Sequence, residues 1–560
     1  MCKKLNLLEM IWILLSIIIF LLLCFFLVGP DYRRSLDFES DICMVRFLKG
    51  DLMSLIISNY CPVLEYSIPY GGWPPLHTIM QSVILLIFNS VPYSRLLVGM
   101  LSILLFGIIA ISLINRIIVS ADIPLVFMTA ILSPAAVIYT SLGVRHVLIP
   151  LGAVTSLYLV SIYSKLTKYR LIIIFFIGIM LGLTDWNTYT IIPSLFLLIF
   201  YFSILGKSFD GKDLSSFLIF SIILSFGFLT SFIFYKALLV YEIQSTEYKI
   251  LYTVDGITLK KLLLRSISSP NIILFAIGLS FIRLFWIFLP ILFLLLIVKI
   301  FRAGGIKLSY SLSFDKIIFL LALLAPLLYC IIFSGHVGIG EHSYQILAFL
   351  TPATIFVSYI QLNYNNKNLI RIIYIIILIF LNILNLRGNE LLPDKFLVAS
   401  FGVKTEVPME PGNYNVNEEQ IKLTITDIIR VAIKQITQLP LNHKRLITFN
   451  SFNKSLNNYI IYSNAIKINT MESDILFMFD WTHFSHMYYT DRTIIGVKNY
   501  SELYKWFKYI FNKFGNGNIG IIIPNSSDKE MLTNLKYIYH KTIKLEKVKD
   551  TPYSIIKIYR

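Results

Sequence analysis

The chain consists mostly of long apolar runs separated by short polar connectors. A helical run of about 20 apolar residues is long enough to cross the hydrocarbon core of a bilayer. A shorter apolar run covers 76–91 and follows Pro74 and Pro75 directly. Strands of a transmembrane barrel are much shorter and alternate in polarity, so the pattern predicts a polytopic α-helical membrane protein. The predicted spans are about 6–28, 97–118, 122–140, 145–163, 171–185, 186–204, 214–239, 271–300, 316–334, 344–361 and 370–386.

Composition supports the same fold class. Hydrophobic residues make up 56% of the chain and charged residues 14%, with a mean hydropathy of +0.73; soluble proteins have about 25% charged residues. The first run is too long for a signal-peptide core and lacks a small-residue cleavage site, so it is interpreted as a retained anchor. The net charge of +17 is interpreted as orientation charge on cytoplasmic connectors. A nucleic-acid partner is not expected, because no basic stripe with interleaved aromatic residues is present.

Charged connectors predict how the chain is threaded. The positive-inside rule places Lys3, Lys4 and the basic connectors in the cytoplasm, and loop 29–75 and everything after about 387 then lie outside. Loop 29–75 and the connector that precedes the run 145–163 are both predicted to lie outside, so an even number of spans must separate them. Three apolar runs occur between them, and the shortest, 76–91, is therefore predicted to be re-entrant or interfacial and packed against protein. About 11 crossings result, within a range of about 11–13. The basic connectors are 165–170, 206–212, 299–307 and 363–371.

The composition changes after about residue 387, where a membrane domain of residues 1–387 is predicted to end. Residues 388–420 are polar, contain Pro and Gly, and are interpreted as a linker. Within 421–560, strand-like runs alternate with amphipathic stretches, which predicts an extracytoplasmic α/β domain with a largely parallel sheet. No glycine-rich phosphate loop opens a helix here, so no catalysis is assigned to this domain. The strand-like runs cover 445–450, 474–481, 518–525 and 553–560, and Asn-x-Ser sequons at Asn453, Asn499 and Asn525 agree with an outside location.

The first outer loop, 29–75, carries four acids within eleven positions. Acids beside a membrane helix are costly unless they are solvated or paired. They are therefore interpreted either as part of a solvated loop or first helical turn, or as part of a site. Cys43 and Cys61 share this loop, and they form a disulfide if it is extracytoplasmic or remain two unpaired thiols. The four acids are Asp31, Asp37, Glu39 and Asp41.

A series of short motifs begins in this loop and continues after it in a characteristic order. The order resembles that of the GT-C membrane glycosyltransferases that use polyprenyl-phosphate sugars, such as the lipid A aminoarabinose transferases and the protein O-mannosyltransferases. The resemblance covers residues 5–205 by motif and 206–386 by hydropathy alone. The motifs are Asp37-Phe38-Glu39, Gly50, Trp73-Pro74-Pro75-Leu76-His77, Arg95-Leu96, Pro134 to Ser141, and Arg145-His146.

The chain departs from the family pattern at three positions. Phe38 stands where the second acid of the family's pair is usual. Trp73 stands where the family has a His before the two prolines, and His77 follows them instead. Val147 replaces the Tyr of the family's Arg-x-Tyr element. Which acid of the first loop acts as the base is therefore left open.

The resemblance implies a hexosyl or pentosyl transfer from a polyprenyl-phosphate donor to a lipid, glycan or protein acceptor, at the extracytoplasmic face of the cell membrane. Asp37 would be the base that deprotonates the acceptor. Glu39 and Asp41 would orient it, or Asp37 and Glu39 would bind a divalent cation such as Mg²⁺ or Mn²⁺. Direct displacement of the phosphate by the acceptor corresponds to inversion. No other cofactor is expected.

Arg145 and His146 are the candidates for holding the donor phosphate, because an Arg fork matches phosphate oxygens. The alternatives are an interfacial Arg that snorkels toward water and an ordinary interface His. Asp185 is predicted either to pair with Arg145 or to cap the next helix. The further substrate-pocket candidates are His77, Glu341 and His342.

Two other functions compete with glycosyl transfer. A transporter would need broken helices and buried charges near the bilayer centre, ideally in repeated halves, and the sequence has no evident internal repeat. A flippase or polymerase of lipid-linked glycans would work on similar substrates. Polymerases of this kind usually centre on a large late outer loop rich in Arg, whereas here the acidic loop comes first and the late outer connector 335–343 is short.

Overall fold

The computed structural model describes two parts of the chain, a helical bundle and a small sheet. Everything that follows concerns the described residues. These are 5–28, 58–59, 69–70, 75–88, 91–118, 120–141, 143, 145–162, 167–184, 191–205, 214–245, 284, 287–301, 314–332, 347–362, 366–387, 461–471, 474–478, 490, 492–496, 503, 519–524, 543–547 and 553–558.

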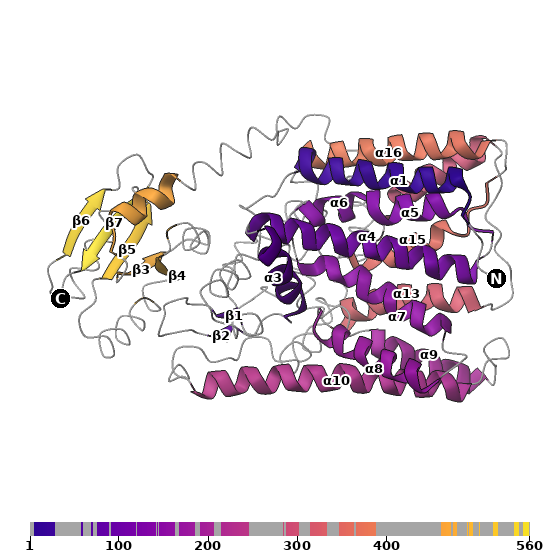
Figure 1. Ribbon diagram of the computed structural model, residues 1–560, viewed down its shortest axis with the longest axis horizontal. Coiled ribbons are helices and arrows are strands. Elements are labelled where there is room, and N and C mark those ends of the chain that lie inside the picture. Colours follow the sequence, from indigo (N-terminus) through magenta and orange to yellow (C-terminus); the bar gives the residue numbers. More distant parts are fainter. Residues whose placement is uncertain are drawn as a thin grey trace, which may run out of the picture.

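The bundle consists of long helices that lie side by side (Figure 1). Asn6 starts the first helix by a capping box, accepting a hydrogen bond from the Glu9 amide at 2.8 Å while the Glu9 carboxylate accepts one from the Asn6 amide at 3.2 Å. The elements are α1 (Leu7–Leu22), η1 (Leu23–Val28), α3 (Leu76–Phe88), α4 (Val91–Ile117), α5 (Ile123–Leu132), α6 (Pro134–Ser141), η3 (Arg145–Val147), α7 (Leu148–Ile162), α8 (Lys168–Gly182), α9 (Ile191–Leu205), α10 (Leu214–Ser245), α13 (Phe314–Ile332), α15 (Leu350–Val357) and α16 (Lys367–Arg387), with a further helix at Ile287–Ile300.

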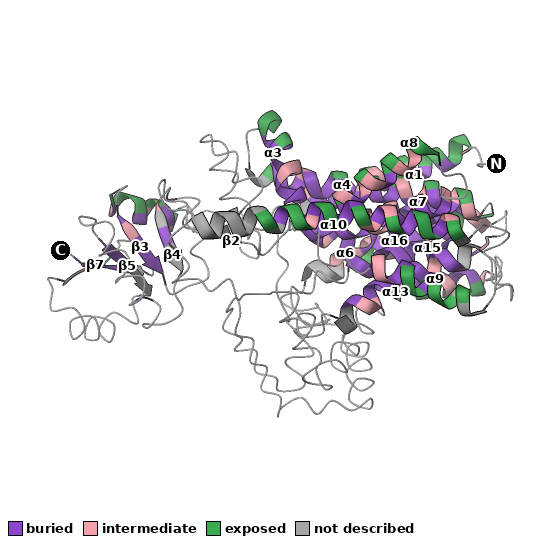
Figure 2. Ribbon diagram, turned by 90° about the horizontal axis from the view of Figure 1, so that it is seen from below, coloured by how far each residue is buried: buried purple, intermediate pink, exposed green. Residues whose placement is uncertain are grey.

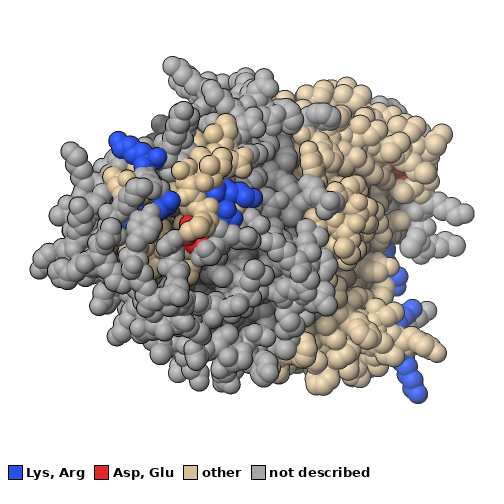
Figure 3. All heavy atoms as spheres, turned by 60° about the vertical axis from the view of Figure 1, so that its left-hand side comes forward, with Lys and Arg blue, Asp and Glu red and all other residues tan. Residues whose placement is uncertain are grey.

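The outer surface of the bundle is apolar, as expected for a protein surrounded by lipid. Figure 2 shows exposed residues along the outward side of α10, and Figure 3 shows a broad described surface of the bundle with few charged side chains. Exposed positions on α10 include Phe226 and Ile233. By length and composition, four of the described helices can cross a membrane, or five if the bent pair α5 and α6 counts as one span. The predicted class, a multi-pass helical membrane protein, is confirmed.

Hydroxyl side chains inside the helices bond to their own backbone. Ser102 donates to the Val98 carbonyl at 2.7 Å, Ser156 to the Gly152 carbonyl at 2.8 Å, and Ser221 to the Phe217 carbonyl at 2.9 Å. This bonding four residues back satisfies polar groups that would be costly to leave unpaired away from water.

The span predicted over 122–140 is broken in the middle. Helices α5 and α6 meet at an angle of 42°, and Ser133 between them has an extended backbone with ψ 135°. The physical reason is Pro134, which disfavours a helical conformation in the residue before it and cannot donate a backbone hydrogen bond. Asn382 of α16 donates to the Leu132 carbonyl at 2.9 Å, so a neighbouring helix satisfies a backbone group exposed by the break.

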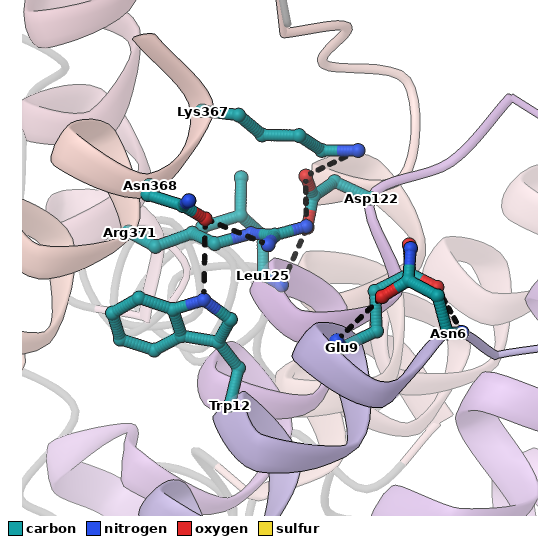
Figure 4. A network of polar contacts seen from close by, with 8 residues as sticks. All are labelled: Asn6, Glu9, Trp12, Asp122, Leu125, Lys367, Asn368 and Arg371. Atoms are coloured by element: carbon teal, nitrogen blue, oxygen red, sulfur yellow. Dashed lines mark hydrogen bonds and ion pairs between the residues drawn. The ribbon is translucent and has the colours of Figure 1, made fainter. Parts of the chain in front are cut away.

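Polar contacts tie α16 to α5 where both helices begin (Figure 4). Arg371 donates to Asp122 Oδ1 and Oδ2 at 2.9 Å from Nη2, and both side chains are almost completely buried. Asp122 caps α5 by accepting from the Leu125 amide, and Lys367 Nζ lies 3.3 Å from its second oxygen. Removing one partner of such a buried pair typically costs about 3–5 kcal/mol. Arg371, predicted from its connector to be orientation charge, is instead a buried structural cation.

The run 76–91 forms two separate features. Its first part is α3, a helix of 13 residues, which at 1.5 Å per residue is about 20 Å long and shorter than the hydrocarbon core. Figure 1 shows α3 lying crosswise to α4 at the end where α4 begins. The last residue of the run, Val91, is already the first residue of α4. That this run is re-entrant or interfacial stays a prediction.

Other predicted spans differ from the helices at their ends. The helix α10 continues to Ser245, six residues into the predicted loop 240–270, because its amphipathic end YEIQS still has good helix formers. Within the predicted span 344–361, the α-helix α15 covers only Leu350–Val357, after a 3₁₀ turn at 347–349. The first part of the predicted span 271–300 lies mostly outside the described residues.

The C-terminal part contains a five-stranded sheet in the order β4-β3-β5-β7-β6. The pairs β3–β4 and β3–β5 are parallel, whereas β5–β7 and β6–β7 are antiparallel. The predicted largely parallel sheet was therefore wrong, because only residues 548–552 separate β6 from β7, too few for a crossover helix. The strands are β3 (Ile475–Met478), β4 (Thr493–Gly496), β5 (Ile519–Pro524), β6 (Ile543–Lys547) and β7 (Tyr553–Ile558). A small antiparallel pair, β1 (Ser58–Asn59) and β2 (Pro69–Tyr70), lies in the first loop.

The domain boundaries stay predictions. Residues 388–460, which include the predicted linker 388–420, lie outside the described residues. Of the predicted strand-like runs, three contain β3, β5 and β7, while 445–450 is not described. The strands β4 and β6 were not predicted.

Candidate functional site

Arg145 and His146 lie in a short 3₁₀ turn, η3, between α6 and α7. The turn follows Gly143, whose amide donates to the Thr140 carbonyl at 3.0 Å and whose φ is 63°. Glycine adopts this left-handed conformation without the steric cost that a side chain would add. The side chains of Arg145 and His146 are both only 3% exposed. The local fold therefore turns two basic residues inward rather than toward water.

Arg95 of α4 packs on the same turn. A Cβ atom added to Gly143 would lie 2.6 Å from Arg95 Cγ and 3.0 Å from Arg95 Nε. Arg95 is 2% exposed, which makes it one of the most deeply buried large side chains among the described residues. Two buried guanidinium groups, Arg95 and Arg145, thus come from different helices to the same short segment of chain.

Close packing of α4 on α6 holds Arg95 in this place. A Cβ added to Gly99, one turn after Arg95, would lie 3.0 Å from the Thr140 carbonyl oxygen. Glycine is the residue that permits such close backbone approach. Because Thr140 also accepts the hydrogen bond from Gly143, the helix that carries Arg95 and the turn that carries Arg145 share one rigid junction.

His77 reaches this end of the bundle from α3. It lies in the first turn of that helix and is 1% exposed. The amide of Leu76 donates to the Leu183 carbonyl at 2.9 Å, which fastens the start of α3 to the end of α8. Leu183 stands two residues before Asp185 in the sequence. The structure therefore places His77 beside the segment of chain that leads to Asp185, another predicted pocket residue.

The remaining candidates lie outside the described residues. Among the described residues, no group of three His, Cys, Asp or Glu side chains could hold a metal ion. The predicted metal ligands belong to the undescribed first loop, so they stay predictions. The candidates in question are Asp37, Glu39 and Asp41, the possible disulfide partners Cys43 and Cys61, and Asp185, Glu341 and His342.

The described part of the site has the character of an anion-binding surface. Burying an ionisable side chain within a membrane protein is expensive, and such residues usually mark substrate or ion sites. Guanidinium groups bind phosphate oxygens through two parallel hydrogen bonds, which suits them to a phosphate ester. Arg95 and Arg145 together with His146 could neutralise such a group as negative charge develops on it.

Arg95 is the residue whose importance the sequence analysis missed. It was recognised only as the start of a helix in the series of family motifs. A signal was nevertheless present, because Arg95 is the fifth residue of α4, near the helix end at which the dipole disfavours a cation. A cation at an unfavourable helix end is a reason to look for an anion nearby.

Comparison with solved structures identifies the fold. ArnT from Cupriavidus metallidurans, solved bound to undecaprenyl phosphate, superposes on this chain with a TM-score of 0.56 and covers 98% of both chains at 11% identity. ArnT in the apo state superposes with a TM-score of 0.55 over 98% of both chains, again at 11% identity. ArnT is a GT-C glycosyltransferase.

This chain has the GT-C fold. The resemblance seen in the order of the motifs is thus confirmed at the level of fold. No family known from sequence matches the chain, and no curated protein matches it either. In the GT-C protein described here, the motif Pro134 to Ser141 is the helix α6 and the motif Arg145-His146 is the turn η3.

Proposed function

We propose that this protein is a membrane glycosyltransferase that moves a hexose or pentose from a polyprenyl-phosphate donor to a lipid, glycan or protein acceptor at the extracytoplasmic face. The observation that carries the proposal is the pair of buried arginines, Arg95 and Arg145, on a GT-C fold. The structural neighbour ArnT was solved with undecaprenyl phosphate bound. A lipid-linked phosphate is therefore the ligand that fits both the fold and the buried cations.

In this proposal, one group of residues holds the leaving phosphate and another group activates the acceptor. Arg145, His146 and Arg95 hold the donor phosphate and stabilise its charge as it leaves. Asp37 accepts the proton of the acceptor hydroxyl or amine, which then attacks the sugar carbon directly with inversion. Glu39 and Asp41 orient that acid. The balance of the reaction is one glycosidic bond formed, one sugar–phosphate bond broken, and a proton released to the base.

The acids of the first loop provide the decisive test. The purified protein in nanodiscs would be given a polyprenyl-phosphate donor with a radiolabelled sugar and a membrane extract as the acceptor source. Asp37→Asn and Glu39→Gln should each lower the rate of sugar transfer, with Asp37→Asn reducing it by about 100-fold or more, the range expected for loss of a general base. Asp31→Asn, in the same loop, is the matched control and should leave the rate unchanged.

Two outcomes would contradict the proposal in different ways. Unchanged transfer in both Asp37→Asn and Glu39→Gln would remove the assignment of the base but keep the enzyme class. No sugar transfer by the wild-type protein from any of a hexose, aminohexose or aminopentose donor, together with movement of the intact lipid-linked sugar across the bilayer, would favour the alternative of a transporter or flippase.

A further inference from the structure

The helix α3 has its polarity reversed relative to an ordinary surface helix. Its buried side carries polar residues, of which His77 and Gln81 are 1% and 0% exposed. These two residues are four positions apart and so lie on one face of the helix. The opposite side is apolar and exposed, with Leu86 at 69% and Ile87 at 72%. All four polar residues of α3 are buried, Thr78 and Ser82 included, whereas its apolar residues divide between buried positions such as Leu85 and exposed ones such as Val83 and Phe88.

The physical meaning of this arrangement is that α3 stands between lipid and a polar interior. Apolar residues on the outward side are favourable only where they meet the acyl region of a bilayer. An amide or imidazole on the inward side is favourable only where hydrogen-bonding groups face it. The helix therefore turns its apolar side toward the membrane and its polar residues toward the protein.

The helix α3 packs against α4, and the start of α4 carries Ser94 and Arg95, both buried. Arg95 in turn lies on Gly143, two residues before Arg145. A phosphate held by the arginines would thus have the polar face of α3 on one side. The group bonded directly to that phosphate in the donor is the sugar.

Glutamine suits the recognition of sugar hydroxyl groups. Its amide offers two hydrogen-bond donors and an acceptor in one plane. The hydroxyl of Ser82, on the same side of α3, donates a hydrogen bond to the Ile79 carbonyl at 2.6 Å, within its own helix. Gln81 and His77 are the longest polar side chains on this face of α3.

We propose that the buried polar face of α3 binds the hydroxyl groups of the donor sugar, with Gln81 as the principal contact. This inference rests on the proposed function, because it requires that the arginines hold the donor phosphate. It adds that discrimination between donor sugars depends on α3, whereas the arginines act on the phosphate that all donors share and the acids of the first loop act on the acceptor.

Binding measurements with two kinds of lipid test this inference. Purified wild-type protein and Gln81→Leu would be titrated with undecaprenyl phosphate and with undecaprenyl phosphates bearing a hexose, an N-acetylhexosamine or an aminopentose. The sugar-bearing lipid that the wild type binds most tightly serves as the probe. Gln81→Leu should weaken binding of that lipid by about tenfold and leave binding of sugar-free undecaprenyl phosphate within about twofold of wild type.

Two further variants separate recognition from folding. Gln361→Leu makes the same substitution near Ser120, to which Gln361 donates at 3.0 Å, and it should leave the binding of both lipids unchanged. Gln81→Asn keeps the amide on a shorter stem and should weaken the sugar-bearing lipid in the same direction by less. It replaces Gln81→Leu as the decisive variant if the latter does not fold.

The outcomes distinguish the inference from the function on which it rests. Equal weakening of both lipids, no weakening of either, or a wild type that binds no sugar-bearing lipid more tightly than the bare carrier would overturn the role of α3 while leaving the enzyme class intact. A wild type that binds neither kind of lipid would overturn the proposed function, and the inference with it.

Discussion

At the scale of single residues, the site depends on one glycine that carries no chemistry. Gly143 adopts φ 63° and lies under the Arg95 side chain. Because Gly143 has no side chain, the Arg95 side chain can pack directly on the turn that carries Arg145. The sequence motif marks Arg145 and His146, but only the structure shows that Arg95 packs on the glycine two residues before Arg145.

A change at Gly143 should act through Arg95. Gly143→Ala would place a Cβ 2.6 Å from Arg95 Cγ, close to the rigid base of that side chain, and would cost about 1–2 kcal/mol for the left-handed backbone. We expect weaker binding of undecaprenyl phosphate, by about tenfold, measured by titration of the purified protein. The assay is a double-mutant cycle with Arg95→Gln. If Gly143→Ala weakens binding as much in the Arg95→Gln background as in wild type, the two residues act independently and the explanation is wrong.

At the scale of elements, small residues allow two neighbouring helices to approach closely. Gly178 and Gly182 are four residues apart on α8 and face α10. A Cβ at Gly178 would collide with the Leu224 carbonyl of α10, and one at Gly227 of α10 with the Phe175 carbonyl of α8. Within a bilayer, such close contact is a main source of helix association, because lipid tails are as apolar as the side chains.

Adding bulk to this contact should therefore destabilise the bundle. Gly178→Leu is expected to lower the thermal stability of the detergent-solubilised protein, at a cost of about 1–3 kcal/mol or more, as for overpacked cores. Ile172→Phe, which adds bulk at an exposed position of α8, is the matched control and should leave stability unchanged. A Gly178→Leu protein as stable as Ile172→Phe would show that this contact does not hold α8 to α10. The measurement is thermal unfolding followed by fluorescence-detected size exclusion.

At the scale of the whole molecule, the two ends of the bundle carry different groups of buried charged residues. Asp122, Arg371 and Lys367 join the starts of α5 and α16 in a buried ionic network (Figure 4). The other end, where α3 lies crosswise and α4 begins, carries the buried basic residues Arg95, Arg145 and His146. The first network joins two helices, and we propose that the second group binds the donor phosphate.

The predicted orientation of the molecule rests on its charged connectors and can be tested directly. In a variant with the five native cysteines replaced, a single cysteine at Lys165 or at Asn499 would be challenged with a membrane-impermeant maleimide in intact cells. We expect labelling at Asn499 without permeabilisation and at Lys165 only after it, since basic connectors remain in the cytoplasm. The opposite pattern would place the first loop in the cytoplasm and remove the proposed mechanism.

The sequence by itself determined the class of fold and the approximate place of the helices. Long apolar runs have few alternatives in a bilayer, because a helix satisfies every backbone hydrogen bond within its own segment. The order of short motifs was enough to predict GT-C, and the structural comparison confirmed it at 11% identity. Local rules also sufficed for the start of α1 at Asn6 and, in hindsight, for the break at Pro134.

Only the tertiary structure decided which residues meet. The approach of Arg95 to Gly143 and the pairing of Asp122 with Arg371 join positions that are 48 and 249 residues apart in the chain. The reversed polarity of α3 is likewise visible only once its buried and exposed sides are known. Hydropathy reports how apolar a segment is, whereas contacts between distant segments depend on how helices of similar composition pack, and that packing is set by shape and by the pairing of buried polar groups.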